Sequence, residues 1–128
     1  MSYTIKNLSD VEDSAPKFGF GERQEAHFAQ GALDAEDTGF SYHVVKPGQR
    51  QGFAHRHENA EEVYVVIGGT GRINLDGEAV ELQRLDAVRV APQVARAFEA
   101  DGDGLELLAF GPHHEGDGEL IHDDVWPS

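Results

Sequence analysis

Residues 52–71 read GFAHRHENAEEVYVVIGGTG, and this stretch indicates both a fold and a site. His55 and His57 lie two residues apart, and on a β-strand side chains with that spacing point to the same face. Glu62 follows at the entry to an apolar run that ends in glycines. The stretch therefore predicts two imidazoles and one carboxylate that turn toward the same point at the start of a strand.

These three side chains have the donor chemistry of a metal site. Imidazole is the commonest neutral ligand for first-row divalent metals. Two histidines and one carboxylate leave open positions on a metal, and non-haem iron chemistry uses that arrangement. We therefore expect His55, His57 and Glu62 to hold a divalent metal (Fe, Mn, Ni or Zn) that acts as a Lewis acid or an oxygen-binding centre.

Outward from this stretch, glycines and prolines divide the chain into short segments that alternate in polarity or are rich in β-branched residues. Asp76-Gly77 lies between two such segments and is the clearest hairpin signal. Further turns are expected at residues 47–48, 68–69 and 101–104. Nine strands are expected, at residues 25–30, 40–46, 52–57, 63–67, 71–75, 79–83, 87–90, 96–100 and 105–110.

Short strands with turns at near-regular spacing predict an all-β protein, either a closed barrel or a sandwich of the jelly-roll kind. The length suits a single domain over residues 1–128, with its core at about 21–110, an irregular N-terminal arm and an irregular C-terminal tail. Residues 63–67 are apolar on both faces, which predicts a strand covered by the core on one side and a partner on the other. A homodimer that hides this strand and a sheet edge is therefore expected.

Composition restricts the classes of partner. The chain has a net charge of −14, and such an acidic surface repels nucleic-acid phosphates and anionic lipid. No apolar run approaches the roughly 20 residues that span a bilayer, and the N-terminus lacks the pattern of a signal peptide. Because the chain has no cysteine, disulfides and thiolate metal ligands are excluded. We expect a cytoplasmic protein that binds a small molecule, with neither nucleic acid nor membrane as a partner.

The opening stretch resembles the first motif of the cupin superfamily, in which a glutamate and a glycine follow two closely spaced histidines. Four residues separate His57 from Glu62 and six separate Glu62 from Gly69, as in that motif, whereas six rather than five lie between Gly48 and His55. The resemblance covers about residues 21–110 and is to a small, single-domain cupin of the conserved-barrel type. It implies a double-stranded β-helix (jelly-roll) barrel. It leaves the reaction open, because cupins include oxygenases, isomerases, decarboxylases, storage proteins and sensors.

The second cupin motif is matched only in part, within residues 83–100. Pro92 fits that motif, but Leu85 and Gln93 stand where it has glycines. Arg96 takes the position at which the motif has its ligand histidine. Arginine cannot ligate a metal, because its guanidinium group stays protonated and has no acceptor. The resemblance therefore implies a site with its fourth ligand replaced by a positive charge.

Two main hypotheses follow from Arg96. In the first, a divalent metal lies on His55, His57 and Glu62, and Arg96 orients an anionic substrate group. In the second, Arg96 pairs with Glu62 in place of the metal, and the protein is a metal-free binding module or sensor. A structural dimer without a ligand is a third interpretation.

Other side chains are candidates for the surroundings of the site. Tyr64 and Phe98 share strand parity with Glu62 and Arg96, so they are expected to line the same interior and contact a substrate, or to serve as core residues. His43, on the preceding strand, is a candidate substrate contact or replacement ligand. Three tail histidines would reach the metal if the tail folded over the barrel mouth: His113, His114 and His122.

Overall fold

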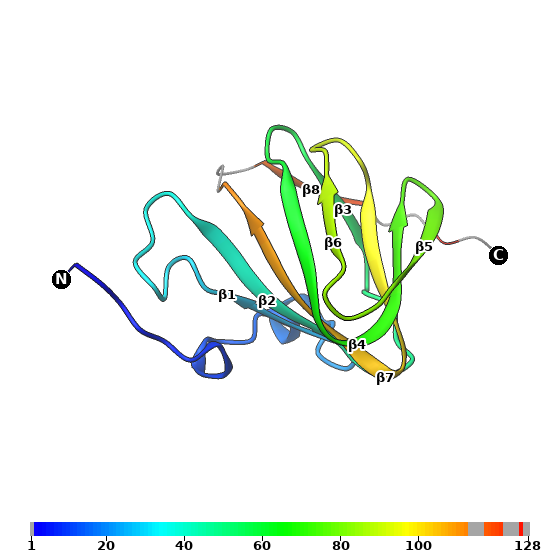
Figure 1. Ribbon diagram of the computed structural model, residues 1–128, viewed down its shortest axis with the longest axis horizontal. Helices are drawn as coiled ribbons and strands as arrows, with labels where there is room; N and C mark the ends of the chain where they lie inside the picture. Colours follow the sequence, from blue (N-terminus) through cyan, green and yellow to red (C-terminus); the bar gives the residue numbers. More distant parts are fainter. Residues whose placement is uncertain (1, 113–116, 122–125, 127–128) are drawn as a thin grey trace.

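The chain folds into a curled antiparallel sheet, with two short 3-10 helices in the N-terminal arm (Figure 1). This computed structural model describes residues 2–112, 117–121 and 126. Within them, the predicted all-β class is confirmed. The elements are η1 (Leu8–Asp10), η2 (Ala15–Phe18), β1 (Gln24–Phe28), β2 (Gly39–Val45), β3 (Ala54–His57), β4 (Glu62–Leu75), β5 (Glu78–Leu82), β6 (Ala87–Val90), β7 (Arg96–Gly111) and β8 (Gly118–Ile121).

Strand β7 holds the sheet together because it pairs with β2, β3 and β4. The sheet follows the order β1-β2-β7-β3-β8, and β4 adds β5 and β6 through its own pairings. Inward-facing apolar side chains of these strands fill the interior, among them Val45, Val66 and Leu107, which are all fully buried. The strand that carries the two histidines is thus fixed to the same central strand as the barrel core.

Strands β4 and β7 are each longer than the sequence predicts. The glycines at 68–69 and the segment 101–104 were both expected to be turns, and both expectations are wrong, because β4 and β7 continue through these residues. The pairing of β4 with β7 shifts register between Val66 and Gly68 and again between Gly69 and Gly71, and these shifts are β-bulges. Gly69 has a φ of 71°, and a Cβ there would overlap the carbonyl oxygen of Gly104. The glycine thus permits a close backbone approach rather than a chain reversal.

The hairpin predicted at Asp76-Gly77 is confirmed. These two residues join β4 to β5, and both have positive φ, 51° for Asp76 and 94° for Gly77. Positive φ at both central positions is the geometry of a type I′ turn, whose twist matches that of the flanking strands.

The C-terminal tail is not irregular throughout, which corrects the prediction. β8 pairs antiparallel with β3, so that His55 lies opposite Leu120 and His57 lies opposite Gly118. On its other side, His55 pairs with Arg96 of β7. The tail therefore supplies a backbone neighbour to the strand that carries both histidines.

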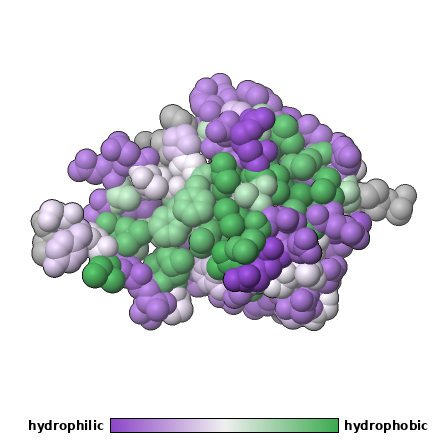
Figure 2. Space-filling view, viewed as in Figure 1, coloured by the Kyte–Doolittle hydropathy of each residue, from purple (hydrophilic) through white to green (hydrophobic). Residues whose placement is uncertain are grey.

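Figure 2 shows apolar residues gathered across the middle of one face of the molecule, between hydrophilic residues. The rings of Phe40 on β2 and Phe110 on β7 stack with their centroids 5.7 Å apart, and Val63 of β4 lies opposite Phe110. Val63 and Val65, which alternate with the buried Tyr64, are only half-buried in this chain. A homodimer that covers this face stays a prediction.

The N-terminal arm contributes η1 and η2 and then runs into β1. No helix in residues 2–112, 117–121 and 126 is long and apolar enough to cross a membrane. His27 of β1 links the N-terminal arm to the sheet, because its Nδ1 lies 2.7 Å from the carbonyl oxygen of Val11. Its Nε2 lies 2.9 Å from Oε1 of Glu25 on the same strand. The Tyr42 ring stacks on the imidazole, and the Asp13 carboxylate also faces it.

We expect His27→Gln to make the stability of the protein less dependent on pH. Burial alone lowers the pKa of His27, but the contacts with Glu25 and Val11 outweigh it and raise that pKa above 6.5. Because the pKa is higher in the folded state, protonation of His27 stabilises the fold. This contribution is complete at pH values below the pKa of the unfolded state, and it is lost as the pH rises through the pKa of the folded state. Urea denaturation between about pH 6 and pH 9 should therefore show a steeper loss for wild type. Equal slopes for the two proteins would contradict the prediction.

Candidate metal centre

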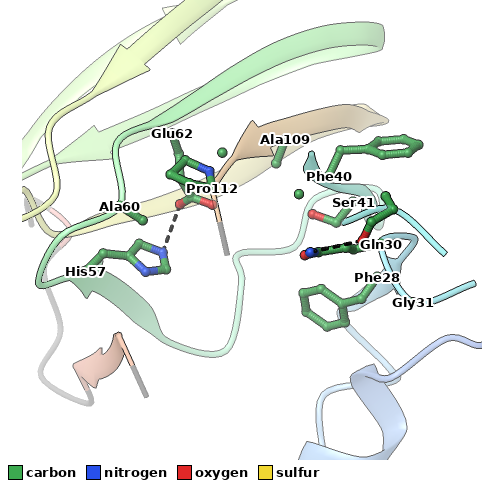
Figure 3. A pocket seen from close by; sticks show the side chains of 13 residues that line it. Phe28, Gln30, Gly31, Phe40, Ser41, His57, Ala60, Glu62, Ala109 and Pro112 are labelled. Atoms are coloured by element: carbon green, nitrogen blue, oxygen red, sulfur yellow. Dashed lines mark hydrogen bonds and ion pairs between the residues drawn. The ribbon is translucent and has the colours of Figure 1, made fainter. Parts of the chain in front are cut away.

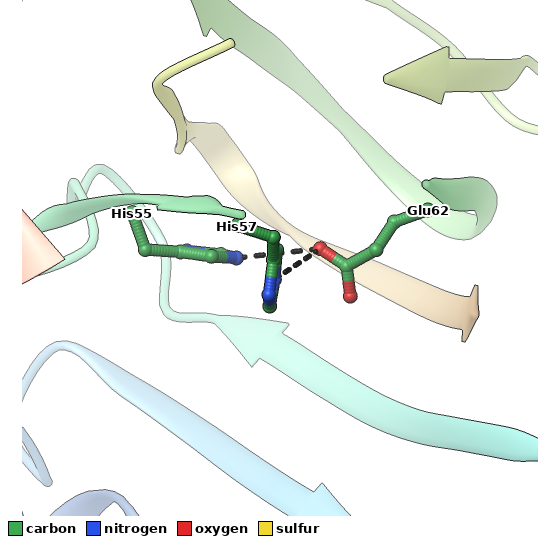
Figure 4. A group of neighbouring side chains, drawn as sticks. All are labelled: His55, His57 and Glu62. Atoms are coloured by element: carbon green, nitrogen blue, oxygen red, sulfur yellow. Dashed lines mark ion pairs between the residues drawn. The ribbon is translucent and has the colours of Figure 1, made fainter. Parts of the chain in front are cut away.

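Two elements bring three donor side chains together inside the barrel. His55 and His57 extend from β3, and Glu62 is the first residue of β4; Figure 4 shows their side chains pointing toward one another. Glu62 Oε1 lies 3.5 Å from His55 Nε2 and 3.0 Å from His57 Nε2. One ligand atom from each residue lies within 4.8 Å of the others, and no other such group occurs among the residues that the structure describes.

The alternation of strand side chains decides which of two adjacent glutamates enters the site. Glu62 faces inward and is half-buried, whereas Glu61 is exposed and contacts Arg89 at 3.2 Å. Tyr64, two residues further along β4, returns to the inward face and is buried. The inward position of Glu62 thus follows from the register of β4.

The Tyr64 hydroxyl holds the Glu62 carboxylate. It donates a hydrogen bond of 2.6 Å to Glu62 Oε1 and lies 3.4 Å from His55 Nε2. Burial, together with the charge of Glu62, raises the pKa of Tyr64 well above its usual range, so the phenol remains a donor. Burial alone would raise the pKa of Glu62, but its contacts with the histidines and Tyr64 outweigh this and hold the pKa well below its usual range. Glu62 is therefore ionised.

Replacing Tyr64 by phenylalanine is expected to lower the free energy of unfolding by about 1.5–3 kcal/mol, because a hydrogen bond to a charged group is lost. The ring and its packing remain, so the change isolates the hydroxyl. Urea denaturation measures the difference. The exposed Tyr3 gives a matched control, since Tyr3→Phe removes a hydroxyl outside the barrel. Equal stabilities for Tyr64→Phe and wild type would contradict the prediction.

His57 has a second carboxylate behind it. Its Nδ1 lies 3.2 Å from Oδ2 of Asp117, whose carboxylate accepts hydrogen bonds from the backbone N–H groups of Asn59 and Ala60 at 2.8 and 3.0 Å. Burial works to raise the pKa of Asp117, but these hydrogen bonds outweigh it and lower that pKa, so Asp117 is ionised. A carboxylate behind a ligand histidine fixes the orientation of the ring. Sequence reasoning missed Asp117, because nothing local distinguishes it from the other acidic residues of the tail.

Arg96 lies beside Glu62. Its side chain is 0 % exposed, and Nη2 lies 3.6 Å from Glu62 Oε1. Nη1 donates to the carbonyl oxygens of Pro92 and Val94 at 3.2 and 3.0 Å, whereas Nε and Nη2 have no aligned hydrogen-bond acceptor. Arg96 lines neither of the two cavities that contact Glu62. Its influence on those cavities is therefore mainly that of a buried positive charge.

Two of the cavities that reach the three donor side chains are lined by both His57 and Glu62. One has a volume of about 310 Å³ and contacts all three of them. The other has a volume of about 550 Å³ and contacts His57 and Glu62. Figure 3 shows this larger cavity, with His57 and Glu62 on one side and Phe28 and Ser41 on the other. Phe28 and Ser41 line both cavities, as His57 and Glu62 do.

The other predicted site residues lie in different surroundings. Tyr64 and His43 line the smaller cavity, whereas Phe98 lies in the core with its ring 4.9 Å from that of Tyr64. His43 is half-buried. Burial lowers its pKa to about 4, and its Nε2 lies 2.7 Å from Ser41 Oγ. His43 is not part of the converging donor group. The tail histidines lie outside the described residues: His113, His114 and His122.

The donor set fits a first-row divalent cation. Two imidazoles and an ionised carboxylate are the ligands of a site with open positions. The ring nitrogens of His57 are buried, yet their close contacts lack the alignment of hydrogen bonds. Buried polar atoms without such partners are costly unless something else satisfies them, and a cation would satisfy Nε2. Glu62 and Asp117 supply the negative charge.

Comparison with known proteins agrees with this architecture. The family model described as "Cupin domain" matches residues 41–110. An uncharacterised protein of Methanocaldococcus jannaschii is 29% identical over 81 residues, which are 61% of this chain and 65% of that protein. The chain thus spans less than two thirds of the length of this relative.

Solved structures of similar shape include a cupin protein from Bacteroides fragilis, with a TM-score of 0.72 and 23% identity over 91% of this chain and 88% of that one. The polyketide cyclase RemF from Streptomyces resistomycificus has a TM-score of 0.75 and 15% identity over 94% of this chain and 86% of that one. These identities show the fold alone. The family match covers more than half of the chain, from β2 to β7, and the curled sheet is that of a double-stranded β-helix. The protein belongs to the cupin family.

Proposed function

We propose that this cupin binds a small molecule inside its barrel at a divalent metal held by His55, His57 and Glu62. The observation that carries the proposal is that one donor atom of each residue lies within 4.8 Å of the others. Between them, these residues also line two cavities inside the barrel. When bound, the metal would supply Lewis-acid or oxygen-binding chemistry at its open positions.

The protein side chains prepare the site for both metal and ligand. Tyr64 holds the Glu62 carboxylate by its hydrogen bond, and Asp117 stands behind the His57 ring. Fixed donors bind a metal more tightly, because less conformational freedom is lost on binding. The apolar walls of the smaller cavity receive the body of the ligand.

Metal analysis tests the proposal. Protein reconstituted with Mn²⁺, Fe²⁺, Ni²⁺ or Zn²⁺ and then desalted is expected to hold about one metal per chain, and His57→Ala less than about a tenth. The control is His27→Gln, which changes a buried histidine outside the site. Metal content is measured by mass spectrometry with inductively coupled plasma. Wild type without metal, or His57→Ala with a full complement, would contradict the proposal.

A second function is favoured by the position of Arg96. Its guanidinium lies 3.6 Å from the Glu62 carboxylate, so the two charges offset one another without a metal. In that case the barrel would bind its ligand by hydrogen bonds alone, as a metal-free binding module or sensor. A double-mutant cycle of Glu62→Gln and Arg96→Met measures the pair. Coupling of about 1–3 kcal/mol in protein that takes up no metal would favour this second function.

A further inference from the structure

We infer that the site takes its metal together with a singly charged carboxylate carried on an apolar, aromatic body. The inference rests on the proposed metal site and adds two properties to it, the chemical class of the ligand and a coupling between metal and ligand. Two independent features carry it: the charges fixed around Glu62 and the composition of the smaller cavity.

The fixed charges leave a bound metal with one positive charge in excess. Among the described residues around the donor atoms, Glu62 and Asp117 are negative and Arg96 is positive. A metal-bound imidazole is neutral, and the Tyr64 hydroxyl donates a hydrogen bond of 2.6 Å to Glu62 Oε1. Glu119 also borders the cavity, but it is paired with Arg56 at 2.9 Å, so the two cancel. The charges of a divalent cation, the two carboxylates and the guanidinium therefore sum to +1. A single carboxylate from a ligand would neutralise this net charge.

Arg96 is the origin of this excess, and its charge is fixed. The side chain is completely buried, and Nη1 donates to the carbonyl oxygens of Pro92 and Val94. A guanidinium does not lose its proton in proteins, and solvent ions do not screen a group that they cannot approach. With a neutral side chain at position 96, the metal and the two carboxylates would balance without any further ligand.

The smaller cavity defines the body of the ligand. Its wall holds four phenylalanines, and the rings of Phe20 and Phe53 lie 4.9 Å apart. Its polar groups include the donor side chains, Tyr64 and His43. Its volume of about 310 Å³ is at the small end of ligand pockets. Such a space suits a compact molecule with an apolar ring at the phenylalanines and its charged end at the metal. The four phenylalanines are Phe18, Phe20, Phe28 and Phe53.

Binding of Mn²⁺ in the presence of benzoate tests the inference on the intact protein. Benzoate has the predicted charge and ring, and benzamide is an uncharged molecule of nearly the same shape. Saturating benzoate is expected to lower the dissociation constant of Mn²⁺ by about 5- to 150-fold, whereas benzamide should leave it unchanged. Free Mn²⁺ is measured by electron paramagnetic resonance. By linkage, Mn²⁺ should tighten benzoate binding by the same factor.

Variants of Arg96 separate charge from packing. Arg96→Met is expected to bind Mn²⁺ more tightly than wild type without benzoate and to lose the benzoate effect. Arg96→Lys keeps the charge and should keep the effect. Arg89→Met removes an exposed arginine that contacts Glu61, and should behave as wild type. Thermal unfolding establishes that each variant is folded, and if Arg96→Met is not, the comparison of benzoate with benzamide on wild type decides alone.

The outcomes separate this inference from the proposed function. Mn²⁺ binding that benzoate leaves unchanged would overturn the coupling while the metal site stands. Equal enhancement by benzamide would overturn the assignment of a carboxylate. A benzoate effect that persists in folded Arg96→Met would overturn the role of the buried charge. Wild type that binds no Mn²⁺ under any of these conditions would overturn the inference and the proposed function together.

Discussion

Glu62→Ala is expected to lower the affinity for metal by at least about 100-fold. Loss of an outer-shell partner alone lowers metal affinity by up to about 100-fold, and Glu62 is itself a proposed ligand. The substitution removes the only carboxylate of the donor group and leaves the two histidines with the buried charge of Arg96 beside them. Equilibrium dialysis against Mn²⁺ measures the change. Unaltered affinity would show that the metal, if bound, lies elsewhere.

The same variant should unfold more easily without metal. Removing one partner of a buried ion pair leaves the other charge uncompensated, which costs about 3–5 kcal/mol. Glu61→Ala is a matched control, because Glu61 is the adjacent glutamate and faces solvent in contact with Arg89. It should keep both the metal affinity and the stability of wild type. A difference of less than about 1 kcal/mol between the two variants in urea denaturation would contradict the buried-pair interpretation.

Gly69→Ala is expected to destabilise the protein by about 3–5 kcal/mol, through backbone strain and overpacking at one position. Gly69 has a φ of 71°, which an alanine adopts only with strain. Its new Cβ would also overlap the carbonyl oxygen of Gly104 on β7, and a backbone atom cannot rotate away as a side chain can. Urea denaturation measures the loss.

Gly102→Ala is the matched control for this substitution. Gly102 lies on β7 near the same bulge, but its φ is not positive and a Cβ there would meet nothing within 4 Å. The change should therefore stay within about 0.5 kcal/mol of wild type. Comparable losses for the two glycines would indicate that glycine content, and not the bulge at Gly69, sets the stability of this region.

The sequence predicts the donor group well, because the rule behind it is local. Two residues on one short strand necessarily share a face, and the inward position of Glu62 follows from the alternation along the next strand. The same alternation predicts an inward-facing Tyr64. The alternation does not predict whether an inward side chain borders a cavity or packs in the core. Phe98 shares the inward side, yet its ring packs in the core against that of Tyr64. Whether a residue borders a cavity depends on its neighbours in space.

The errors of the sequence-based prediction concern contacts that are distant along the chain. Gly69 fits a turn as well as a bulge, and only the approach of Gly104 on β7 decides between them. The segment Gly118–Ile121 has no alternation of buried and exposed residues. It becomes a strand because β3 offers it a backbone partner. The position of Asp117 behind His57 follows from that pairing.

The pairing of β3 also has a consequence for how the protein is made. His55 has Arg96 as its neighbour on one side and Leu120 on the other, so neither partner exists until the ribosome has passed those codons. Earlier strands can collapse as the nascent chain emerges, but pairings over such long separations form late and slowly. The histidine strand is therefore enclosed on both sides only after Leu120 has been synthesised, and a metal would meet a strand that is already paired on both edges.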